Sequence, residues 1–389
     1  MTGLRVFVIA GEASGDALGA ELIKGLRALS SGVEFRGIAG PQMQRLGMGS
    51  LFQMEELSVM GLAEILPKYR HLKRRIAQTA QAVLEMRPDV LITIDSPDFC
   101  LRVARRVRAK APAIRTVHYV APSVWAWRPG RARHMAQVID QVLALLPFEP
   151  PLMQAAGMRC DFVGHPVATA PQASAAEVAT FRARLGVGGG PLVLALPGSR
   201  RSEVERLTPV FGAALQKLAG QLPELRVVLP AAPGVARLVQ RVVADWRVPV
   251  TVLDPTDRDA AQVQAEKRAA FAVADVALAA SGTVSLELAA AETPMVIGYR
   301  MSWLTMQIMR RMALIDTVTL VNLVSETRVV PEFLGEACTP DALAGGLRAV
   351  LRAPEAQRAA ARLTLERLGR GGESPGLRAA RAVLDGLRV

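Results

Sequence analysis

Short apolar segments recur along this chain, and each one runs into a polar turn and a helix-like stretch. They cover residues 4–10, 34–39, 89–94 and 142–148 in the first half, and residues 192–196, 226–230, 250–253 and 275–280 in the second. The segment 89–94 shows little alternation of apolar and polar residues, which is typical of a central strand in a parallel sheet. Two successive runs of strand and helix predict an α/β fold with two Rossmann-like domains.

The chain has 389 residues, which is long enough for two sizeable cores. Residues 168–176 are rich in Ala, Pro and Ser, a composition typical of a linker. We therefore expect a first domain over residues 1–167 and a second over 168–345. The remaining residues, 346–389, are rich in Ala, Leu and Arg and favour helices.

Composition excludes several classes of protein. The longest apolar runs, such as 142–148, are far shorter than the roughly 20 residues that span a bilayer. The first residues lead directly into a strand without a signal-peptide pattern, so we expect a cytosolic protein. Its 3 cysteines and 4 histidines are scattered. This distribution argues against a zinc cluster or a disulfide framework and favours reduced, buried cysteines.

The formal net charge of +12 points to an anionic partner, which leaves nucleic acid, an acidic membrane surface or a phosphorylated substrate. An apolar stretch at residues 60–66 is followed at 68–75 by five Lys/Arg and no acid. Such a pattern favours contact with anionic lipid over a core loop beside a solvated helix face. The residues of this expected membrane contact are Leu62, Ile65, Leu66, Lys68, Arg70, Lys73 and Arg74.

A second basic region lies between Cys100 and Asp140 and contains the run Trp125-Ala126-Trp127-Arg128 after an expected strand. Aromatic rings and arginines at a strand end suit a wall for a sugar or acyl chain with a phosphate clamp, formed by Trp127 and Arg128. Nucleic acid is the rival partner. The sequence shows no helix-turn-helix, RRM or other reader module, and its aromatic residues are too few for a stacking platform.

Acidic side chains follow two strands of the first half. The loop at 11–16 lacks the G-x-G-x-x-G pattern, and its acids Glu12 and Asp16 would repel a diphosphate. They suit sugar hydroxyl groups, with Ser14 as a further substrate contact; the alternative is a tight turn with Asp16 as a helix cap. Asp95 and Asp98 follow residues 89–94 and are candidates for a general base, although Asp98 also suits a helix cap.

The second half carries two turns suited to phosphate groups. Pro197-Gly198-Ser199-Arg200 follows one strand and places Arg200 beside free backbone amides at a helix start. Ser281-Gly282-Thr283 follows another strand, with Glu287 in the next helical turn, where a carboxylate reaches a ribose diol. The alternative for this second turn is a capped helix with a Glu that satisfies the helix dipole.

Several motifs together closely resemble the lipid-A-disaccharide synthase family of GT-B glycosyltransferases. They are residues 10–16, 54–57, 59–61, 118–128, 196–200 and 280–283. The resemblance extends from Val6 to about Leu334, and the Trp-Ala-Trp-Arg run is its most specific part. It implies two Rossmann-like domains whose parallel sheets face each other across an interdomain cleft.

The resemblance also implies a reaction. The family transfers 2,3-diacylglucosamine from its UDP derivative to 2,3-diacylglucosamine 1-phosphate (lipid X). The product is the β-1,6 disaccharide phosphate of lipid A and lipopolysaccharide biosynthesis, and UDP leaves with inversion at the anomeric carbon. Asp95 falls on the family's essential aspartate, with Asp98, Glu12 and Asp16 as alternatives. Arg200 falls on its essential arginine.

Other expectations follow from the same resemblance. Ser281, Gly282, Thr283, Glu287 and Asn322 match positions that contact UDP, and Ser199, next to Arg200 in the sequence, is a further expected UDP contact. The family needs no metal or other cofactor, is peripheral on the cytosolic face of the inner membrane, and exchanges C-terminal segments in a homodimer. We thus expect residues 346–389 to pack on the first domain of the same or the partner chain. The rivals are another GT-B enzyme, such as a UDP-sugar 2-epimerase or a soluble-acceptor glycosyltransferase, and a nucleic-acid binder.

Overall fold

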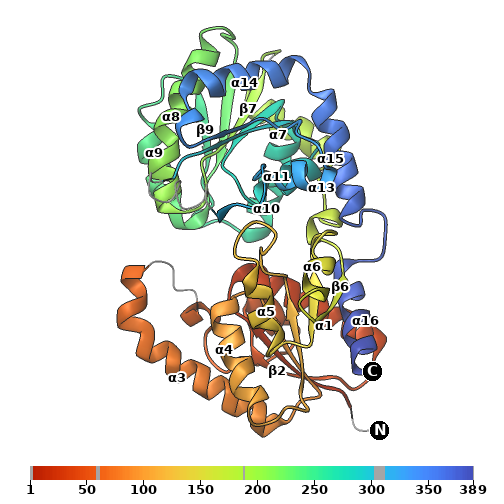
Figure 1. The fold of residues 1–389 in the computed structure, drawn as a ribbon. Coiled ribbons are helices and arrows are strands. Elements are labelled where there is room, and N and C mark those ends of the chain that lie inside the picture. The colour runs from red at the N-terminus through yellow and green to blue at the C-terminus, as the bar shows by residue number, and fades with distance from the viewer. Residues whose placement is uncertain (1–2, 58–61, 187–188, 302–311, 389) are drawn as a thin grey trace. The chain divides into compact units, whose positions relative to one another are not determined.

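A computed structural model describes residues 3–57, 62–186, 189–301 and 312–388. The chain divides into two compact units (Figure 1). Unit 1 holds residues 1–169 and 371–389, and unit 2 holds residues 170–370. Each unit contains a six-stranded parallel sheet. The predicted fold class, an α/β chain with two Rossmann-like halves, is confirmed.

Unit 1 is built on the strand order β2-β1-β3-β4-β5-β6. Its strands are β1 (Arg5–Ala10), β2 (Glu34–Ile38), β3 (Val90–Ile94), β4 (Arg115–Tyr119), β5 (Gln141–Ala144) and β6 (Arg159–Phe162). Its helices are α1 (Ala13–Leu29), α2 (Pro41–Arg45), α3 (Leu62–Met86), α4 (Pro97–Arg108), α5 (Gly130–Ala136), α6 (Pro150–Gln154) and α16 (Pro375–Leu387), with 3-10 turns η1 (Met54–Leu57) and η2 (Pro166–Ala168). Every residue of β3 is buried, as expected for a central strand covered on both faces.

Unit 2 follows the strand order β12-β11-β10-β7-β8-β9. Its strands are β7 (Leu192–Leu196), β8 (Arg226–Pro230), β9 (Val250–Leu253), β10 (Val276–Ala279), β11 (Met295–Tyr299) and β12 (Glu332–Leu334). Its helices are α7 (Ala175–Arg184), α8 (Arg201–Ala219), α9 (Ala236–Val243), α10 (Ala260–Val273), α11 (Val284–Ala290), α13 (Leu320–Ser325), α14 (Pro340–Arg352) and α15 (Glu355–Arg367), with 3-10 turns η3 (Pro233–Val235) and η4 (Gly335–Ala337). Its core packs buried Val and Leu of the sheet against α8, α9 and α14.

The C-terminal helices are divided between the units, which differs from the single tail expected over 346–389. Helix α14 packs on α8, and α15 packs on α11 and α13, so both belong to unit 2. Helix α16 alone returns to unit 1 and packs on α1 of the same chain. The approach is close: a Cβ on Gly25 would lie 2.6 Å from the carbonyl oxygen of Gly376, so neither helix has room for a side chain there.

Two smaller expectations are corrected or confirmed. The strand expected over 142–148 ends at Ala144, because the backbone then turns and the amide of Leu146 donates to the Glu149 side chain at 2.9 Å. Cys100, Cys160 and Cys338 are buried and carry free thiols, as predicted. Among the described helices, none has the length and apolarity needed to cross a membrane.

Candidate functional site

The topology of unit 2 explains why its two phosphate-like turns meet. Strands β7 and β10 are neighbours in a parallel sheet, so the turns that follow them emerge at the same edge. A pocket of about 570 Å³ opens there. Both turns line it, as do the loops after β8 and β9 and the facing side of α10. The structure thus brings together Ser199, Arg200, Ser281, Gly282, Thr283 and Glu287, all of which were predicted from sequence.

The turn after β7 differs from its prediction in one respect. The amides of Ser199 and Arg200 are not free, because they donate to Glu203 Oε2 at 3.2 and 3.3 Å. The guanidinium of Arg200 is largely exposed, and its Nη1 lies 3.6 Å from Glu203 Oε1. Arg200 is therefore placed at the pocket as expected, whereas the backbone amides are used within the protein.

The turn after β10 has an open backbone. Gly282 adopts φ +144°, a region that favours glycine, and both Gly282 and Thr283 are exposed. Ser285 stabilises the turn, because its Oγ donates to the carbonyl oxygen of Gly282 at 2.9 Å. Glu287 lines the pocket one turn further on, and Lys267 Nζ lies 2.5 Å from its Oε2.

A further acid at the pocket, Glu266 of α10, links this helix to α7 and to the loop before α10. Glu266 is bonded to Arg184 of α7 and, at 2.5 Å, to Arg258 of the loop before α10. Burial raises the pKa of the Glu266 carboxyl, but the hydrogen bonds from Arg258 and Arg184 outweigh it and keep that pKa below its ordinary value. The wall therefore carries an ionised carboxylate between two arginines.

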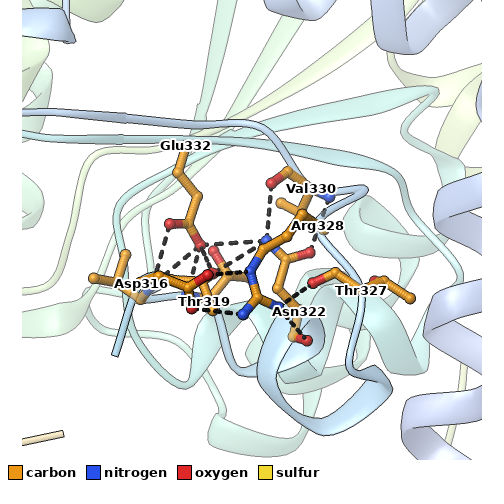
Figure 2. A network of polar contacts seen from close by, with 9 residues as sticks. Asp316, Thr319, Asn322, Thr327, Arg328, Val330 and Glu332 are labelled. Carbon is orange, nitrogen blue, oxygen red and sulfur yellow. Dashed lines mark hydrogen bonds and ion pairs between the residues drawn. The ribbon is translucent and has the colours of Figure 1, made fainter. Parts of the chain in front are cut away.

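Asn322 has a different role from the nucleotide contact suggested by sequence. It is 1% exposed, and Figure 2 shows it inside a network of polar contacts. Its Nδ2 donates to the carbonyl oxygen of Val330 at 2.9 Å, and its Oδ1 accepts from the amide of Val330 at 3.0 Å. Glu332 accepts from the amide of Thr319 at 2.8 Å, at the start of α13. Asn322 thus fixes the segment before β12, and its side chain does not line the pocket.

The carboxyl edge of the unit 1 sheet carries unusual backbone. Asp95 and Ser96 follow β3 with φ of +52° and +44°, and Val120 follows the neighbouring β4 with φ +82°. Left-handed conformations of residues other than glycine are costly and cluster at functional sites, and a β-branched residue rarely adopts one. Asp95 is partly exposed and its Oδ1 accepts from the amide of Ser96 at 2.8 Å, whereas Asp98 is exposed in the first turn of α4.

The acidic glycine loop lies against the same edge, because β1 and β3 are neighbours. A Cβ on Gly11 would lie 2.3 Å from Ser96 Oγ, so the loop and the end of β3 are in direct contact. Glu12 is partly exposed and Ser14 is exposed. These two residues and Asp95 therefore come from adjoining segments of one sheet edge.

Asp16 is excluded from this group. Its side chain is 1% exposed and accepts from the amides of Gln42 at 2.8 Å and Met43 at 3.1 Å. It caps α2, a helix distant in sequence, rather than holding sugar hydroxyls or capping its own helix α1. The prediction of a catalytic or acceptor-binding role for Asp16 is wrong on this geometry.

The two tryptophans after β4 have separate environments. Trp125 packs edge-on against Phe148 at 5.3 Å, and its Nε1 donates to Glu149 Oε1 at 3.2 Å. Trp127 is partly exposed and lies under the guanidinium groups of Arg128 and Arg131, at 4.3 and 5.5 Å from its ring centroid. Trp125 therefore anchors the loop, and Trp127 with Arg128 presents an aromatic and cationic surface.

Three residues of these regions were not found from sequence. Glu203 stands three residues after Arg200, a capping-box spacing that could have been noticed. Lys267 and Glu149 give no such signal, because their partners lie 20 and 24 residues away. Burial raises the pKa of the Glu149 carboxyl to about 7.

The expected membrane contact falls on helix α3. The side chains of Leu62, Ile65, Leu66 and Lys68 lie outside the described residues, as do residues 59–61 of the family motif. Arg70, Lys73 and Arg74 are exposed. The neighbouring Arg75 is instead tied to Glu56 at 2.7 Å, which holds α3 to the Met54–Leu57 turn.

Solved structures share this fold across the whole chain. The UDP-GlcNAc 2-epimerase of Neisseria meningitidis, bound to UDP-GlcNAc, matches with a TM-score of 0.61 and 11% identity, covering 99% of this chain and 100% of that one. HepE of Anabaena, in complex with UDP-glucose, matches with a TM-score of 0.57 and 14% identity, covering 99% of each. At such identity the likeness establishes the GT-B architecture alone.

Sequence relatives are much closer. The profile of the lipid-A-disaccharide synthetase family matches residues 6–370. The lipid-A-disaccharide synthase of Ruegeria pomeroyi is 65% identical, covering 99% of this chain and 96% of that protein. Its counterpart in Rhodospirillum centenum is 47% identical, covering 99% and 95%. The family resemblance is confirmed: the chain belongs to the lipid-A-disaccharide synthase family, the glycosyltransferases of lipid A biosynthesis.

Proposed function

We propose that the unit 2 pocket binds the UDP part of a UDP-2,3-diacylglucosamine donor, and that unit 1 holds the acceptor 2,3-diacylglucosamine 1-phosphate. The observation that carries this proposal is the meeting of Arg200, the Ser281–Thr283 turn and Glu287 around one pocket, in a chain of this family. Two structural neighbours, solved with UDP-GlcNAc and with UDP-glucose, support a UDP-sugar as the ligand class.

Each pocket group suits one part of the donor. Arg200 offers a fixed cation and several N–H donors to the diphosphate. The amides and hydroxyls of the Ser281–Thr283 turn, in which Gly282 and Thr283 are exposed residues, suit the same group. Glu287 offers carboxylate oxygens to the two ribose hydroxyls. Lys267 forms an ion pair with Glu287 and offsets its negative charge, so this carboxylate repels the diphosphate less.

The reaction is a single displacement at the anomeric carbon. The acceptor 6-hydroxyl oxygen attacks that carbon, and its bond forms as the bond to the diphosphate oxygen breaks. The hydroxyl proton passes to a carboxylate, for which we propose Asp95, and the electron pair leaves with UDP. General-base catalysis of this kind contributes about 100- to 10,000-fold. Asp98 and Glu12 are the alternative bases. Arg200 stabilises the charge on the departing UDP, so we expect turnover without a metal ion.

The first half of α3 is proposed as the membrane contact. Both substrates carry two acyl chains, so the enzyme must draw them from a bilayer. The exposed Arg70, Lys73 and Arg74 follow the apolar residues Leu62, Ile65 and Leu66 along the helix. We propose that this surface docks on anionic lipid of the inner membrane's cytosolic face.

A homodimer with exchanged C-terminal segments stays a prediction, which mass photometry of the purified protein tests.

Turnover of defined substrates tests the proposal. Purified protein with UDP-2,3-diacylglucosamine and the diacylglucosamine 1-phosphate, in detergent with EDTA, is expected to release UDP and form the disaccharide phosphate. Arg200→Ala should lower kcat by roughly 100-fold, as for loss of one donor to a developing charge. Formation of UDP-N-acetylmannosamine from UDP-N-acetylglucosamine, with no disaccharide, would instead identify a 2-epimerase. Activity that disappears with EDTA and returns with Mg²⁺ would contradict the metal-free mechanism.

A further inference from the structure

We infer that Glu203 is a positioning residue that holds Arg200 for its work on the donor diphosphate, an inference that rests on the function proposed above. Glu203 lines the pocket on the first turn of α8, and its side chain is only 15% exposed. Its carboxylate takes both the backbone amide of Arg200 and, at 3.6 Å, the guanidinium of the same residue. Both ends of Arg200 are thus tied to one group.

The contacts go beyond those of an ordinary helix cap. A capping glutamate needs only the amide of the cap residue, whereas Glu203 also accepts from the amide of Ser199 and from the hydroxyl of Tyr299 at 3.3 Å. Tyr299 ends β11, so the carboxylate links the turn to a second strand of the sheet. A carboxylate has about four acceptor positions; hydrogen bonds from Ser199, Arg200 and Tyr299 use three of them, and the Arg200 guanidinium lies at ion-pair distance from the same group.

The shape of the turn is also matched to this carboxylate. A Cβ on Gly198 would lie 2.4 Å from Glu203 Oε2 and 2.6 Å from Glu203 Cβ, so the side chain occupies the space that any larger residue would need. Burial and the nearby Glu203 charge raise the pKa of Tyr299, which keeps its hydroxyl protonated as a donor. The turn, the carboxylate and the tyrosine therefore form one fixed support.

This support changes how the diphosphate is recognised. The amides of Ser199 and Arg200 already donate to the Glu203 carboxylate, so they stabilise the turn rather than bind the diphosphate. The diphosphate is left to the guanidinium of Arg200 and to the Ser281–Thr283 turn. Binding of the diphosphate by the turn after β7 then depends on the position of the Arg200 guanidinium. A misplacement of about 1 Å costs up to about 100-fold in rate.

A double-mutant cycle tests the inference, with kcat measured at saturating donor and acceptor. Glu203→Gln keeps the size of the side chain but loses its charge and half of its acceptor oxygens. We expect it to lower kcat by about 10-fold and Arg200→Ala by about 100-fold. If Glu203 acts through Arg200, the double variant should be no slower than Arg200→Ala within about 2-fold, because residues that act as a unit are not additive.

Controls separate the outcomes. Glu205→Gln lies on the same helix and should leave kcat unchanged, because Glu205 is exposed and its partner within the described part of the chain is Arg201. Tyr299→Phe removes one donor to Glu203 without touching the turn, and should lower kcat by about 3-fold even if Glu203→Gln folds poorly. A double variant slowed by the product of the single effects would overturn the role of Glu203 alone. An unchanged kcat in Arg200→Ala would remove the proposed role of Arg200, and that of Glu203 with it.

Discussion

Lys267 and Glu287 form an ion pair across the rim of the unit 2 pocket, with Nζ 2.5 Å from Oε2. The carboxylate assigned to the ribose therefore carries its own counter-ion, supplied by α10, and keeps a second oxygen for a ligand. This pairing places a cation directly beside the carboxylate that lines the pocket.

The first prediction concerns ribose recognition. A hydrogen bond from a ribose hydroxyl to a charged group is worth about 1.5–3 kcal/mol, so wild type should bind UDP about 10- to 100-fold more tightly than 2′-deoxy-UDP. Glu287→Gln should bind UDP more weakly and lose most of this preference. Isothermal titration calorimetry with both nucleotides measures it. An equal preference in both proteins would remove Glu287 from the ribose site.

The second prediction concerns the base. Asp95 has φ +52°, a conformation that Asn tolerates and Ala does not, so Asp95→Asn changes the chemistry with little backbone strain. We expect kcat to fall by about 100- to 10,000-fold while the Kd for UDP is unchanged. Asp98→Asn, on the exposed first turn of α4, is the matched control and should retain activity. If instead Asp98→Asn is the inactive variant, the base is Asp98.

The third prediction concerns pH and stability. Glu149 is 3% exposed, and burial raises the pKa of its carboxyl from 4.5 to about 7. Between these values the folded protein binds the extra proton, so stability falls as pH rises from about 4.5 to 7. The contribution is about 3 kcal/mol at most. Glu149→Gln removes it, so the stability of the variant relative to wild type should rise over this range and be flat above it.

Denaturant unfolding followed by tryptophan fluorescence at several pH values measures this difference. Burial also lowers the pKa of His118 and His165 to about 4, so their contributions are lost as pH falls from 6.5 toward 4. Both histidines are present in the two proteins and cancel in the comparison. A difference that does not change between pH 4.5 and 7 would show that Glu149 titrates normally.

The fourth prediction concerns the membrane surface. Each basic residue near an anionic bilayer is worth about 1 kcal/mol, so Arg70→Gln with Arg74→Gln should weaken vesicle binding by roughly 30-fold at low salt. Vesicles containing phosphatidylglycerol, sedimented with the protein, provide the assay. Arg241→Gln with Arg352→Gln makes the same charge change at exposed positions of unit 2 and should bind as wild type. Equal weakening in both pairs would point to net charge alone.

A companion variant addresses the apolar part of the same surface. The triple variant Leu62→Ser, Ile65→Ser and Leu66→Ser should no longer bind vesicles. It should keep its activity in detergent, because the detergent already disperses the acylated substrates. Unchanged vesicle binding would assign these three side chains to structure.

The pocket could be predicted from sequence because its groups sit in short motifs at strand ends. Arg200 and Ser281–Thr283 follow β7 and β10, and parallel strands deliver such turns to one edge. Asp16 and Asn322 could not be assigned in this way. A carboxylate in a loop reads the same whether it faces a ligand or, as Asp16 does, amides 26 and 27 residues away. The internal partner is decided by tertiary packing.

The C-terminal helices illustrate the same limit. Helices α14, α15 and α16 have similar Ala-, Leu- and Arg-rich sequences, and their periodicity shows an apolar face without saying what covers it. The structure places α16 in unit 1 through its packing on α1, with Gly376 against Gly25, and through hydrogen bonds from Gln141 to the carbonyl oxygen of Ala382 and from Arg378 to that of Phe162.

The return of α16 to α1 has a consequence for the newborn protein. The ribosome completes residue 169 about two hundred residues before it reaches α16, so unit 1 is left without one of its helices while all of unit 2 is being made. During that interval the part of α1 around Gly25 that packs on α16 lacks its partner helix. Unit 1 therefore completes its packing only after all of unit 2 has been synthesised.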